Sequence, residues 1–488
     1  MDAHQIKKPS IKVNFALNFL RIFSAAIVGL LTMPYITRVL GAENLGKVEY
    51  VYTIINYFVL FSALGIPMYG IREVSKKRDN EKELFKLVFE LYLILFITTI
   101  LSYLLIFVLI NVSFLSNYRE LIIIMSSMVF LSNIGAEWYF QGIENQKFIT
   151  IRYITVRFLV FILIFLFVNK TEDYQKYAFL VVMLSFGANL INFIFLIYKL
   201  LKQKINVKEI NILQHLKPIF TVFIATVSIN IYLQLDNFLI GILSGDKYVG
   251  YYSMANKLIR YAISFITVIG AVMLPRLSFL FLNDKIQYKE YLKKSLHLMM
   301  ILSVPCTIYF FVFSQNIISF MGGVDFNSSI ITMQILSPLC IIVSLAYFFG
   351  FLILYPQGLE KVYTKATLVS AIFSLIINFY IIKNFQHNGA AVVAVLSELI
   401  AIVFMFVYLK NNGLVYGLFD NNLLKILAAN FIVFSVFYIF LFTKINFFNN
   451  LIVSSILFPI AYALLLFFLK EKHTKDIFDK IIFNKIKK

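Results

Sequence analysis

The sequence predicts an all-α integral membrane protein with fourteen transmembrane helices arranged as two similar halves. Hydrophobic residues occupy 60% of the 488 positions and charged residues only 14%, and the mean hydropathy is +0.84. A chain of this composition cannot form water-soluble domains, because its apolar surface needs lipid. Segments of the first half also recur in the second half. Together these observations predict a helical membrane bundle with an internal repeat.

Fourteen apolar stretches are candidates for transmembrane helices. A hydrocarbon core of roughly 30 Å needs about 20 helical residues, and each stretch approaches or exceeds that length. They lie at residues 14–37, 47–67, 87–110, 120–141, 153–169, 177–198, 217–243, 249–274, 295–320, 329–355, 366–385, 390–409, 425–443 and 450–469. The first stretch has no small-residue cleavage pattern, so we expect it to remain as a span and not to act as a cleaved signal peptide.

The basic residues of the loops orient the chain. If the N-terminus is cytoplasmic, alternate loops hold 32 of the 44 lysines and arginines, and the loops on the other side hold only eight. Because Lys and Arg stay on the cytoplasmic side of short loops, both termini are predicted to be cytoplasmic. This bias explains the net charge of +19 without nucleic acid, and no loop is long enough for a basic soluble domain.

The internal repeat predicts how the protein moves. Residues Gly46–Arg72 recur 204 positions later as Gly250–Arg276, and the motif Gln141–Glu144 recurs as Gln357–Glu360. Two similar halves in a membrane can rock against each other around a shared central cavity. We therefore expect transport by alternating access.

Signatures of catalysis are missing from the sequence. The segment Gly41–Val48 nearly spells a phosphate-binding loop, but Val48 stands where the motif needs a hydroxyl, and the segment is a short turn between two apolar stretches. The five histidines have no metal-ligand spacing. The longest extracytoplasmic loop is only about ten residues, too short for a catalytic domain. We expect no enzyme activity, no cofactor and no metal site.

Four cations lie at least one helical turn inside the ends of the apolar stretches. Arg21 lies about two turns inside the first stretch, and Lys257 and Arg260 share one face of the eighth, with Arg260 near its middle. Because a charge in lipid costs at least about 2.5–3.5 kcal/mol, we expect Arg21 and Arg260 to face a water-filled cationic cavity. Lys257 and Arg157 either join them or snorkel to the nearest interface. Guanidinium groups match phosphate oxygens, so the cavity predicts an anionic ligand such as a pyrophosphate.

Acidic residues also lie within the apolar stretches. Asp236 lies in the outer part of the seventh stretch and Glu398 about two turns inside the twelfth. Each either couples transport to a proton or sodium gradient or balances the cavity cations in an internal salt bridge. Glu49, Glu90 and Glu137 lie closer to the ends of their stretches, where they are either interfacial or paired with cavity cations.

The final residues, 471–488, form a basic tail that is predicted to be cytoplasmic. Its apolar positions, Ile477, Phe478, Ile481, Ile482 and Ile486, recur at helical spacing with lysines between them. The tail either lies along the inner leaflet as an amphipathic helix, in contact with anionic membrane lipids, or is a frayed basic end.

Several segments resemble the polysaccharide-transporter family of oligosaccharide flippases, which translocate O-antigen and capsule repeat units in bacteria. This family lies in the multidrug/oligosaccharidyl-lipid/polysaccharide exporter superfamily. The resemblance covers most of the chain and is strongest over roughly the first 280 residues. The segments that carry it are Asn14–Arg21, Pro34–Gly41, Gly65–Glu73, Glu137–Glu144, Asp236–Gly241, Gly250–Ala255 and Pro356–Gly358.

The resemblance implies a specific architecture and function. It implies two six-helix lobes, at 1–204 and 205–420, followed by a helix pair at 421–470 and the tail. Such proteins flip undecaprenyl-pyrophosphate-linked sugar units from the cytoplasmic to the periplasmic leaflet of the inner membrane, and a polysaccharide polymerase and a chain-length regulator are implied partners. In this family cations line the cavity, and Arg21, Lys257 and Arg260 match that pattern, with Arg157 a further candidate.

Two rival functions stay open. A small-molecule or multidrug antiporter of the same superfamily usually carries an acidic residue in the first lobe that binds a cation or proton, whereas the first stretch here carries Arg21. A non-transporting scaffold for polysaccharide polymerisation would cause misassembly when lost, without accumulation of lipid-linked units on the cytoplasmic face.

Overall fold

Helices form every regular element of the part of the chain that the computed structural model describes, which is residues 11–203, 206–414, 417–418, 420–440 and 447–471. The local sequence explains where they begin. For example, α3 (Glu81–Ile110) begins after Asn80, whose side chain accepts a hydrogen bond from the backbone N–H of Glu83. Such a cap satisfies one of the free donors at a helix start. The Leu-, Ile- and Phe-rich run that follows contains no proline and continues for 30 residues.

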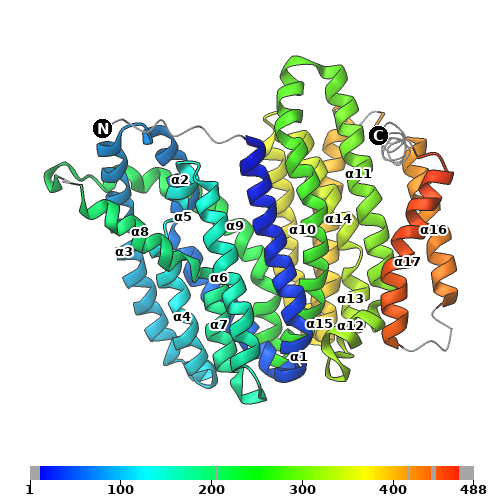
Figure 1. Cartoon of the computed structure of the whole chain (residues 1–488), viewed down its shortest axis with the longest axis horizontal. Helices are drawn as coiled ribbons and strands as arrows, with labels where there is room; N and C mark the ends of the chain where they lie inside the picture. Colours follow the sequence, from blue (N-terminus) through cyan, green and yellow to red (C-terminus); the bar gives the residue numbers. More distant parts are fainter. Residues whose placement is uncertain (1–10, 204–205, 415–416, 419, 441–446, 472–488) are drawn as a thin grey trace, which may run out of the picture. The chain divides into compact units, whose positions relative to one another are not determined.

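The chain divides into two compact units, Met1–Gly241 and Ile242–Lys488 (Figure 1). The helices of the first unit are α1 (Ile11–Ala63), α2 (Ile66–Lys77), α3, α4 (Arg119–Ile134), α5 (Glu137–Gly142), α6 (Gln146–Phe167), α7 (Tyr174–Phe186), α8 (Ala188–Leu201) and most of α9 (Leu213–Leu243). Short 3₁₀ turns lie at Ser113–Tyr118, Thr171–Asp173 and Val207–Glu209.

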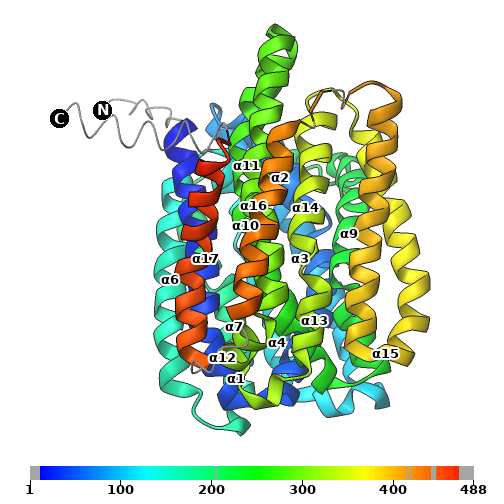
Figure 2. The ribbon, with the colours of Figure 1, turned by 90° about the vertical axis from the view of Figure 1, so that its right-hand side faces the viewer.

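The second unit has the same helical character. Its helices are α10 (Asp246–Asn283), α11 (Lys285–Val312), α12 (Ser314–Gly322), α13 (Ser329–Leu336), α14 (Leu339–Tyr347), α15 (Glu360–Asn411), α16 (Asn421–Phe440) and α17 (Phe447–Phe468). A 3₁₀ turn lies at Val324–Phe326 and a π-helix, η5, at Phe348–Leu354. Figure 2 shows the end of α10 and the start of α11 projecting beyond their neighbours. This is expected, because a helix of 38 residues is about 57 Å long and exceeds the hydrocarbon core.

Two of the helices are each broken into two arms. Helix α1 spans 53 residues and is interrupted at Gly41, where φ is 72° and ψ 174°. Helix α15 spans 52 residues and is interrupted at Gln386, where φ is 47° and ψ −133°. A straight helix of this length would measure about 80 Å, far more than a bilayer core. Each break therefore divides one long helix into two arms, and each arm covers one predicted apolar stretch.

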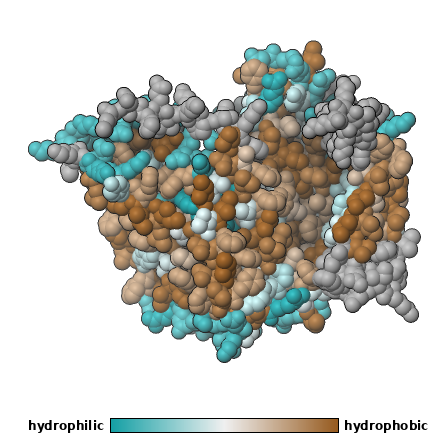
Figure 3. Space-filling model, viewed as in Figure 1, coloured by the Kyte–Doolittle hydropathy of each residue, from teal (hydrophilic) through white to brown (hydrophobic). Residues whose placement is uncertain are grey.

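The predicted fold class, an all-α membrane protein, is confirmed. Within the described residues, nine helices are long and apolar enough to cross a membrane, or ten if the pair Thr171–Phe186 and Ala188–Leu201, bent by 49°, counts as one span. Each of the fourteen predicted stretches overlaps a helix, and the number of crossings stays a prediction. Figure 3 shows mainly hydrophobic residues along the middle of the visible helices and hydrophilic residues at their ends.

Helix α3 shows which side faces lipid. Phe96, Ile100, Leu104 and Phe107 are all exposed, with 65%, 45%, 58% and 69% of their surfaces accessible. They recur at spacings of three and four residues and so form one face of the helix. Exposing this apolar face to water would cost free energy. We therefore infer that this face of α3 contacts the lipid of the bilayer.

The division into units places α9 with the first unit. A Cβ on Gly65 would lie 2.8 Å from the backbone nitrogen of Phe223, and one on Gly241 would collide with the ring of Tyr50. These close approaches fix α9 against α1 and the start of α2. The lobe boundaries predicted at 204, 420 and 470 follow the sequence repeat and stay predictions. The predicted tail lies outside the described residues from position 472 onward.

The repeated Gln-Gly-X-Glu motif forms the same turn in each unit, but in a shifted register. In the first unit Glu144 has φ 59°, and the N–H of Asn145 donates to the carbonyl of Phe140 at 2.9 Å. In the second unit Gly358 has φ 70°, and the N–H of Leu359 donates to Leu354, also at 2.9 Å. Both are left-handed helix terminations. The left-handed residues are 214 positions apart, whereas the motifs are 216 apart, so the structural repeat is offset by two residues from the sequence repeat.

In each unit a histidine and a carboxylate that are far apart in sequence, by 125 and 123 residues, join two separate segments. His215 Nε2 lies 2.9 Å from Glu90 Oε2 on α3, and His215 Nδ1 lies 2.7 Å from the hydroxyl of Tyr69. In the second unit His297 Nε2 on α11 lies 3.0 Å from Asp420 Oδ1. Burial would raise the pKa of Asp420, but the charge of His297 and two backbone N–H donors outweigh burial and hold the pKa below its usual value.

Replacing His215 by alanine is expected to destabilise the first unit. The side chain of Glu90 is 1% exposed, and the change removes its histidine partner and the partner of the Tyr69 hydroxyl. A hydrogen bond to a charged group contributes about 1.5–3 kcal/mol, so we expect a loss of stability of about 2–3 kcal/mol. Thermal unfolding in detergent measures it. Gln214→Ala is the matched control, because the exposed Gln214 approaches Glu90 only at 3.4 Å. Equal melting temperatures for the two variants would contradict the prediction.

Candidate functional site

Helices α1 and α6 run parallel and carry the site between them. Three hydrogen bonds join them at nearly constant sequence separation: Thr150 to the carbonyl of Leu17 at 3.2 Å, Arg157 to that of Ala25 at 3.4 Å, and Tyr35 to that of Val168 at 2.8 Å. This register brings the arginines of both helices to the same side of the first unit.

Arg21 lies on α1 and points toward α5. Its Nη1 donates to Glu137 Oε1 at 2.6 Å, and its Nη2 donates to Asn18 Oδ1 at 3.2 Å. The Arg21 side chain is 23% exposed and that of Glu137 29%. The sequence left the pairing of Glu137 open, and the structure shows that this carboxylate pairs with one of the predicted cavity cations.

Glu137 is the centre of the cluster. It is the first residue of α5 and follows Ala136, which has a left-handed φ of 37° at the sharp turn from α4. Its Oε1 also accepts a hydrogen bond from Gln141 Nε2 at 2.9 Å, and its Oε2 accepts one from Arg152 Nη2 at 3.1 Å. The Glu137 carboxylate thus accepts hydrogen bonds from the guanidinium groups of both Arg21 and Arg152.

Arg152 is the most deeply buried cation of the cluster. Its side chain is 3% exposed, and its Nε and Nη1 have no hydrogen-bond partner among the described residues. Its guanidinium also lies 5.9 Å from the centre of the Phe148 ring. Buried charges are normally paired through all their donors, because desolvation is costly. Arg152 therefore presents two free donors inside a membrane-embedded helix bundle.

Arg157 is the third arginine of the cluster, and its guanidinium lies over the ring of Tyr153. Its guanidinium lies 4.6 Å from the centre of the Tyr153 ring, and that of Arg21 lies 5.7 Å from the same ring. The buried Nε of Arg157 has no partner in the described part of the chain. The sequence left open whether Arg157 snorkels or joins Arg21, and the structure places both beside one aromatic ring. Three guanidinium groups and one carboxylate give the cluster a net positive charge.

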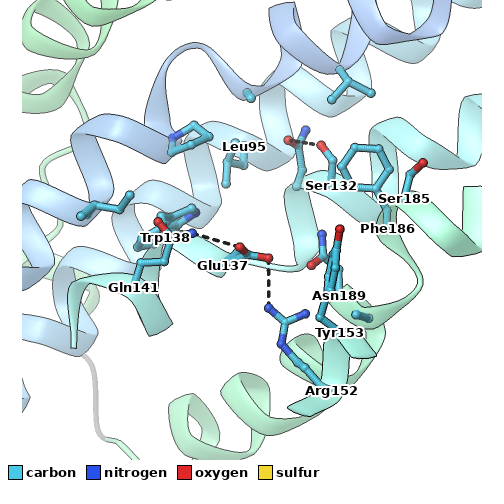
Figure 4. Close-up of a pocket in the computed structure, with 16 residues that line it drawn as sticks. Leu95, Ser132, Glu137, Trp138, Gln141, Arg152, Tyr153, Ser185, Phe186 and Asn189 are labelled. Carbon is cyan, nitrogen blue, oxygen red and sulfur yellow. Dashed lines mark hydrogen bonds and ion pairs between the residues drawn. The ribbon is translucent and has the colours of Figure 1, made fainter. Parts of the chain in front are cut away.

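A cavity of about 290 Å³ opens beside the cluster (Figure 4). Figure 4 shows Glu137 between Gln141 and Arg152, with Tyr153 and Asn189 on the side of Arg152. The polar residues that line the cavity are Ser132, Asn133, Glu137, Gln141, Arg152, Tyr153, Ser185 and Asn189. A Cβ on Gly135 would collide with Asn189, so the glycine permits that amide to approach. At roughly 30 Å³ per water molecule, the cavity has room for a hydrated anionic group.

The other predicted site residues lie elsewhere. Lys257 and Arg260 are both half-buried on α10, and Glu398 is half-buried on the second arm of α15. Arg260 makes no hydrogen bond or ion pair with any residue that the structure describes. Asp236 is half-buried on α9. The binding or coupling roles assigned to these residues stay predictions.

Sequence reasoning missed Arg152. The predicted fifth stretch began at residue 153, so Arg152 was placed in a cytoplasmic loop. The structure starts α6 at Gln146, because the side chain of Asn145 accepts a hydrogen bond from the N–H of Phe148. Asparagine is a preferred helix cap, so the cap was the signal in the sequence that could have placed Arg152 inside the helix.

Comparisons with known proteins agree with this architecture. A protein of Escherichia coli (strain K12) named as an O-antigen transporter is 24% identical over 394 residues, which is 80% of this chain and 94% of that protein. A protein of Shigella dysenteriae with the same name is 23% identical over 82% of this chain and its own full length. A low-salt glycan biosynthesis flippase of Haloferax volcanii is 27% identical over 37% of this chain and 38% of its own.

Solved structures show the same fold. The lipid II flippase MurJ in an inward closed conformation matches with a TM-score of 0.74 and 16% identity, covering 96% of this chain and 99% of MurJ. A multidrug resistance MATE family transporter in an inward-facing conformation matches with a TM-score of 0.61 and 11% identity, covering 84% of this chain and 96% of its own. The sequence profile of one family matches residues 11–281, more than half of the chain. The chain therefore belongs to the polysaccharide biosynthesis protein family.

Proposed function

We propose that the protein is a flippase that moves undecaprenyl-pyrophosphate-linked oligosaccharide units from the cytoplasmic to the periplasmic leaflet of a bacterial inner membrane. The names of its relatives, O-antigen transporter and glycan flippase, support this class of cargo. The fold shared with a lipid II flippase supports the same class. A fold alone supports many functions, so the proposal rests mainly on the site.

The observation that carries the proposal is the excess of guanidinium groups over carboxylates in the cluster around Glu137, which holds Arg21, Arg152 and Arg157. Cations in a membrane protein are costly and mark ligand or ion pathways. Arg152 and Arg157 keep buried nitrogens that have no hydrogen-bond partner in the described part of the chain, and a guanidinium fork binds phosphate oxygens in a bidentate manner. A pyrophosphate supplies the negative charge that this cluster lacks. The cationic cargo of a multidrug antiporter would not supply this negative charge.

Residues of the second unit complete the proposed pathway. Lys257 and Arg260 bind the pyrophosphate or acidic sugars during transport by alternating access. Asp236 and Glu398 either carry a coupling proton or sodium ion or balance these cations. A polysaccharide polymerase and a chain-length regulator act on the cargo after it has crossed.

The isoprenoid tail of the cargo remains in contact with lipid. An apolar cavity of about 500 Å³ lies in the second unit between α10, α11 and α17, lined by residues such as Ala262, Pro305, Tyr309 and Pro459. A tail that occupies such a cavity avoids the cost of exposing its apolar surface to water, at roughly 25 cal/mol per Å². Only the polar head group then crosses the hydrocarbon core.

A deletion strain tests this function. We expect lipid-linked repeat units to accumulate on the cytoplasmic face and surface polysaccharide to disappear. The wild-type gene restores the polymer, whereas Arg21→Ala reduces it about 10- to 100-fold, because one charge-assisted contact of about 1.5–3 kcal/mol is lost. Immunoblots of membranes control for the amount of protein. A non-transporting scaffold would cause misassembly without cytoplasmic accumulation, and that result would refute the flippase.

A further inference from the structure

A second polar cavity lies at the end of the first unit that carries α2 (upper left in Figure 1), which we predict to be cytoplasmic. Its volume is about 360 Å³, and it lies between the α2–α3 turn, the first turns of α3 and the segment that joins α8 to α9. The ionisable residues that line it are Lys77, Lys82, Lys86, Glu83, Glu90 and Glu209. The lining therefore carries both signs of charge and no formal surplus of either.

The three lysines do not pair with the glutamates beside them. None of them forms an ion pair or hydrogen bond with a residue that the structure describes. Glu90 is held by other donors, since the N–H of Asn211 donates to it at 2.8 Å and His215 Nε2 lies 2.9 Å away. The carboxylate of Glu83 has no partner in the described part of the chain. Ammonium and carboxylate groups are thus both available to a ligand.

An apolar groove of about 330 Å³ lies next along α3 and α8, with α4 as its third wall. Phe96 on α3 and Phe130 on α4 line it and are exposed, so the groove opens on the face of the unit that we infer contacts lipid. Its lining on α3 runs from Phe89 to Thr99, about 15 Å at 1.5 Å per residue. This length is half of a hydrocarbon core of roughly 30 Å, which is the depth of one leaflet.

One face of α3 joins the polar cavity to the groove. Lys82, Lys86, Phe89, Leu93 and Phe96 recur at spacings of four and three residues, so their side chains form one row along the helix. The two lysines line the polar cavity, and the three apolar residues line the groove. A ligand that has a charged head and an apolar chain would contact both ends of this row.

Helix α8 repeats this order. Phe193, Ile197 and Leu200 recur at spacings of four and three residues and line the groove, and Gln203, three residues later, lines the polar cavity. Helix α8 runs toward the polar cavity and α3 runs away from it, so the two rows place polar and apolar residues in the same order. Two helices therefore combine a polar site with an apolar groove one leaflet deep, which matches the shape of a phospholipid.

We propose that this site binds one phospholipid of the cytoplasmic leaflet whose head group carries a phosphate and a primary amine, as in phosphatidylethanolamine. Lys82 and Lys86 bind the phosphate oxygens, and Glu83 and Glu209 accept hydrogen bonds from the ammonium group. One acyl chain lies in the groove. The pyrophosphate of the cargo carries two negative charges, for which this lining has no surplus of positive charge. The inference does not depend on the proposed function.

Native mass spectrometry of the purified full-length protein in detergent tests the site. The probes are the dioleoyl forms of phosphatidylethanolamine, phosphatidylglycerol and phosphatidylcholine, which have the same chains and differ only in the head group. We expect phosphatidylethanolamine to bind about tenfold more tightly than the other two lipids. Phosphatidylglycerol has no ammonium group for Glu83, and the quaternary ammonium of phosphatidylcholine has no N–H to donate.

Single substitutions separate the contacts to the head group from those to the chain. Lys86→Ala and Glu83→Gln should each weaken binding of phosphatidylethanolamine about tenfold. Lys76→Ala and Glu81→Gln are the controls, because both residues are exposed near the same end of the unit and do not line the cavity, so these variants should bind like the wild type. Phe96→Ala removes part of the groove wall and should weaken binding of all three lipids by the same factor.

Three results would overturn this inference. The first is an affinity for phosphatidylglycerol or phosphatidylcholine as high as that for phosphatidylethanolamine. The second is unchanged binding of phosphatidylethanolamine by either Lys86→Ala or Glu83→Gln. The third is tighter binding of farnesyl pyrophosphate than of phosphatidylethanolamine, lost in Lys86→Ala, which would assign the cavity to the cargo. None of the three bears on the arginine cluster around Glu137.

Discussion

Replacing Arg152 by alanine is expected to abolish transport and to destabilise the first unit. The side chain is 3% exposed and binds one oxygen of Glu137. Its Nε and Nη1 have no hydrogen-bond partner among the described residues, and these are the donors that we propose bind the cargo. Without it, Glu137 keeps Arg21 but loses its second cation. We expect about 2–3 kcal/mol of lost stability and at least a 100-fold loss of transport. Thermal unfolding in detergent and complementation of the deletion strain measure the two effects.

Two variants serve as comparisons for Arg152→Ala. Arg152→Lys keeps the charge but not the planar fork, so it should recover part of the stability and little of the transport. Arg78→Ala removes another arginine of the first unit, which pairs with Glu144 at 2.7 Å but is 30% exposed. Exposed pairs contribute about 0–1 kcal/mol, so this variant should resemble the wild type. Normal polymer from cells with Arg152→Ala would refute the anion site.

Replacing Arg260 by alanine is expected to reduce transport without loss of stability. The described residues provide no ion pair or hydrogen bond to Arg260, so the change leaves no partner behind. We expect a change in stability within about 0.5 kcal/mol and a loss of transport of about 10- to 100-fold, because a charge-assisted contact to the cargo disappears. Thermal unfolding in detergent measures the stability, and complementation of the deletion strain measures the transport.

Arg276→Ala is the matched control on the same helix. Arg276 is exposed and lies 5.6 Å from the ring centres of both Phe279 and Tyr291. Its loss should cost at most about 1 kcal/mol and leave transport intact. If Arg260→Ala melts several degrees lower than Arg276→Ala and transports normally, Arg260 is a structural residue and its assignment to the cargo is wrong.

The sequence predicted the helical membrane fold because apolar runs and loop charges are local signals. Each predicted stretch overlaps a helix, but the breaks within α1 and α15 depend on single residues, Gly41 and Gln386. Gly41 has a left-handed φ, which glycine adopts at no cost. Gln386 gives no such signal, so its break was not predictable from residue type.

The candidate site was only partly predictable. The depth of Arg21 within an apolar stretch indicated a cavity residue, and its pairing with Glu137 was one of two open alternatives. The partners of Glu137 come from α1 and α6, which are 116 and 15 residues away in sequence. Such contacts depend on the packing of helices and not on spacing. Arg152 was missed because a helix start is the least certain part of a sequence-based prediction.

Movement of a lipid-linked pyrophosphate across the bilayer can be measured with the protein alone. Its most direct test is reconstitution of the purified protein into vesicles with a fluorescent undecaprenyl-pyrophosphate-linked oligosaccharide, followed by a membrane-impermeant quencher. We expect inner-leaflet lipid to become accessible to the quencher with the wild-type protein and to stay protected with Arg152→Ala or in empty vesicles. Equal protection with the wild type and in empty vesicles would contradict the proposed flippase function.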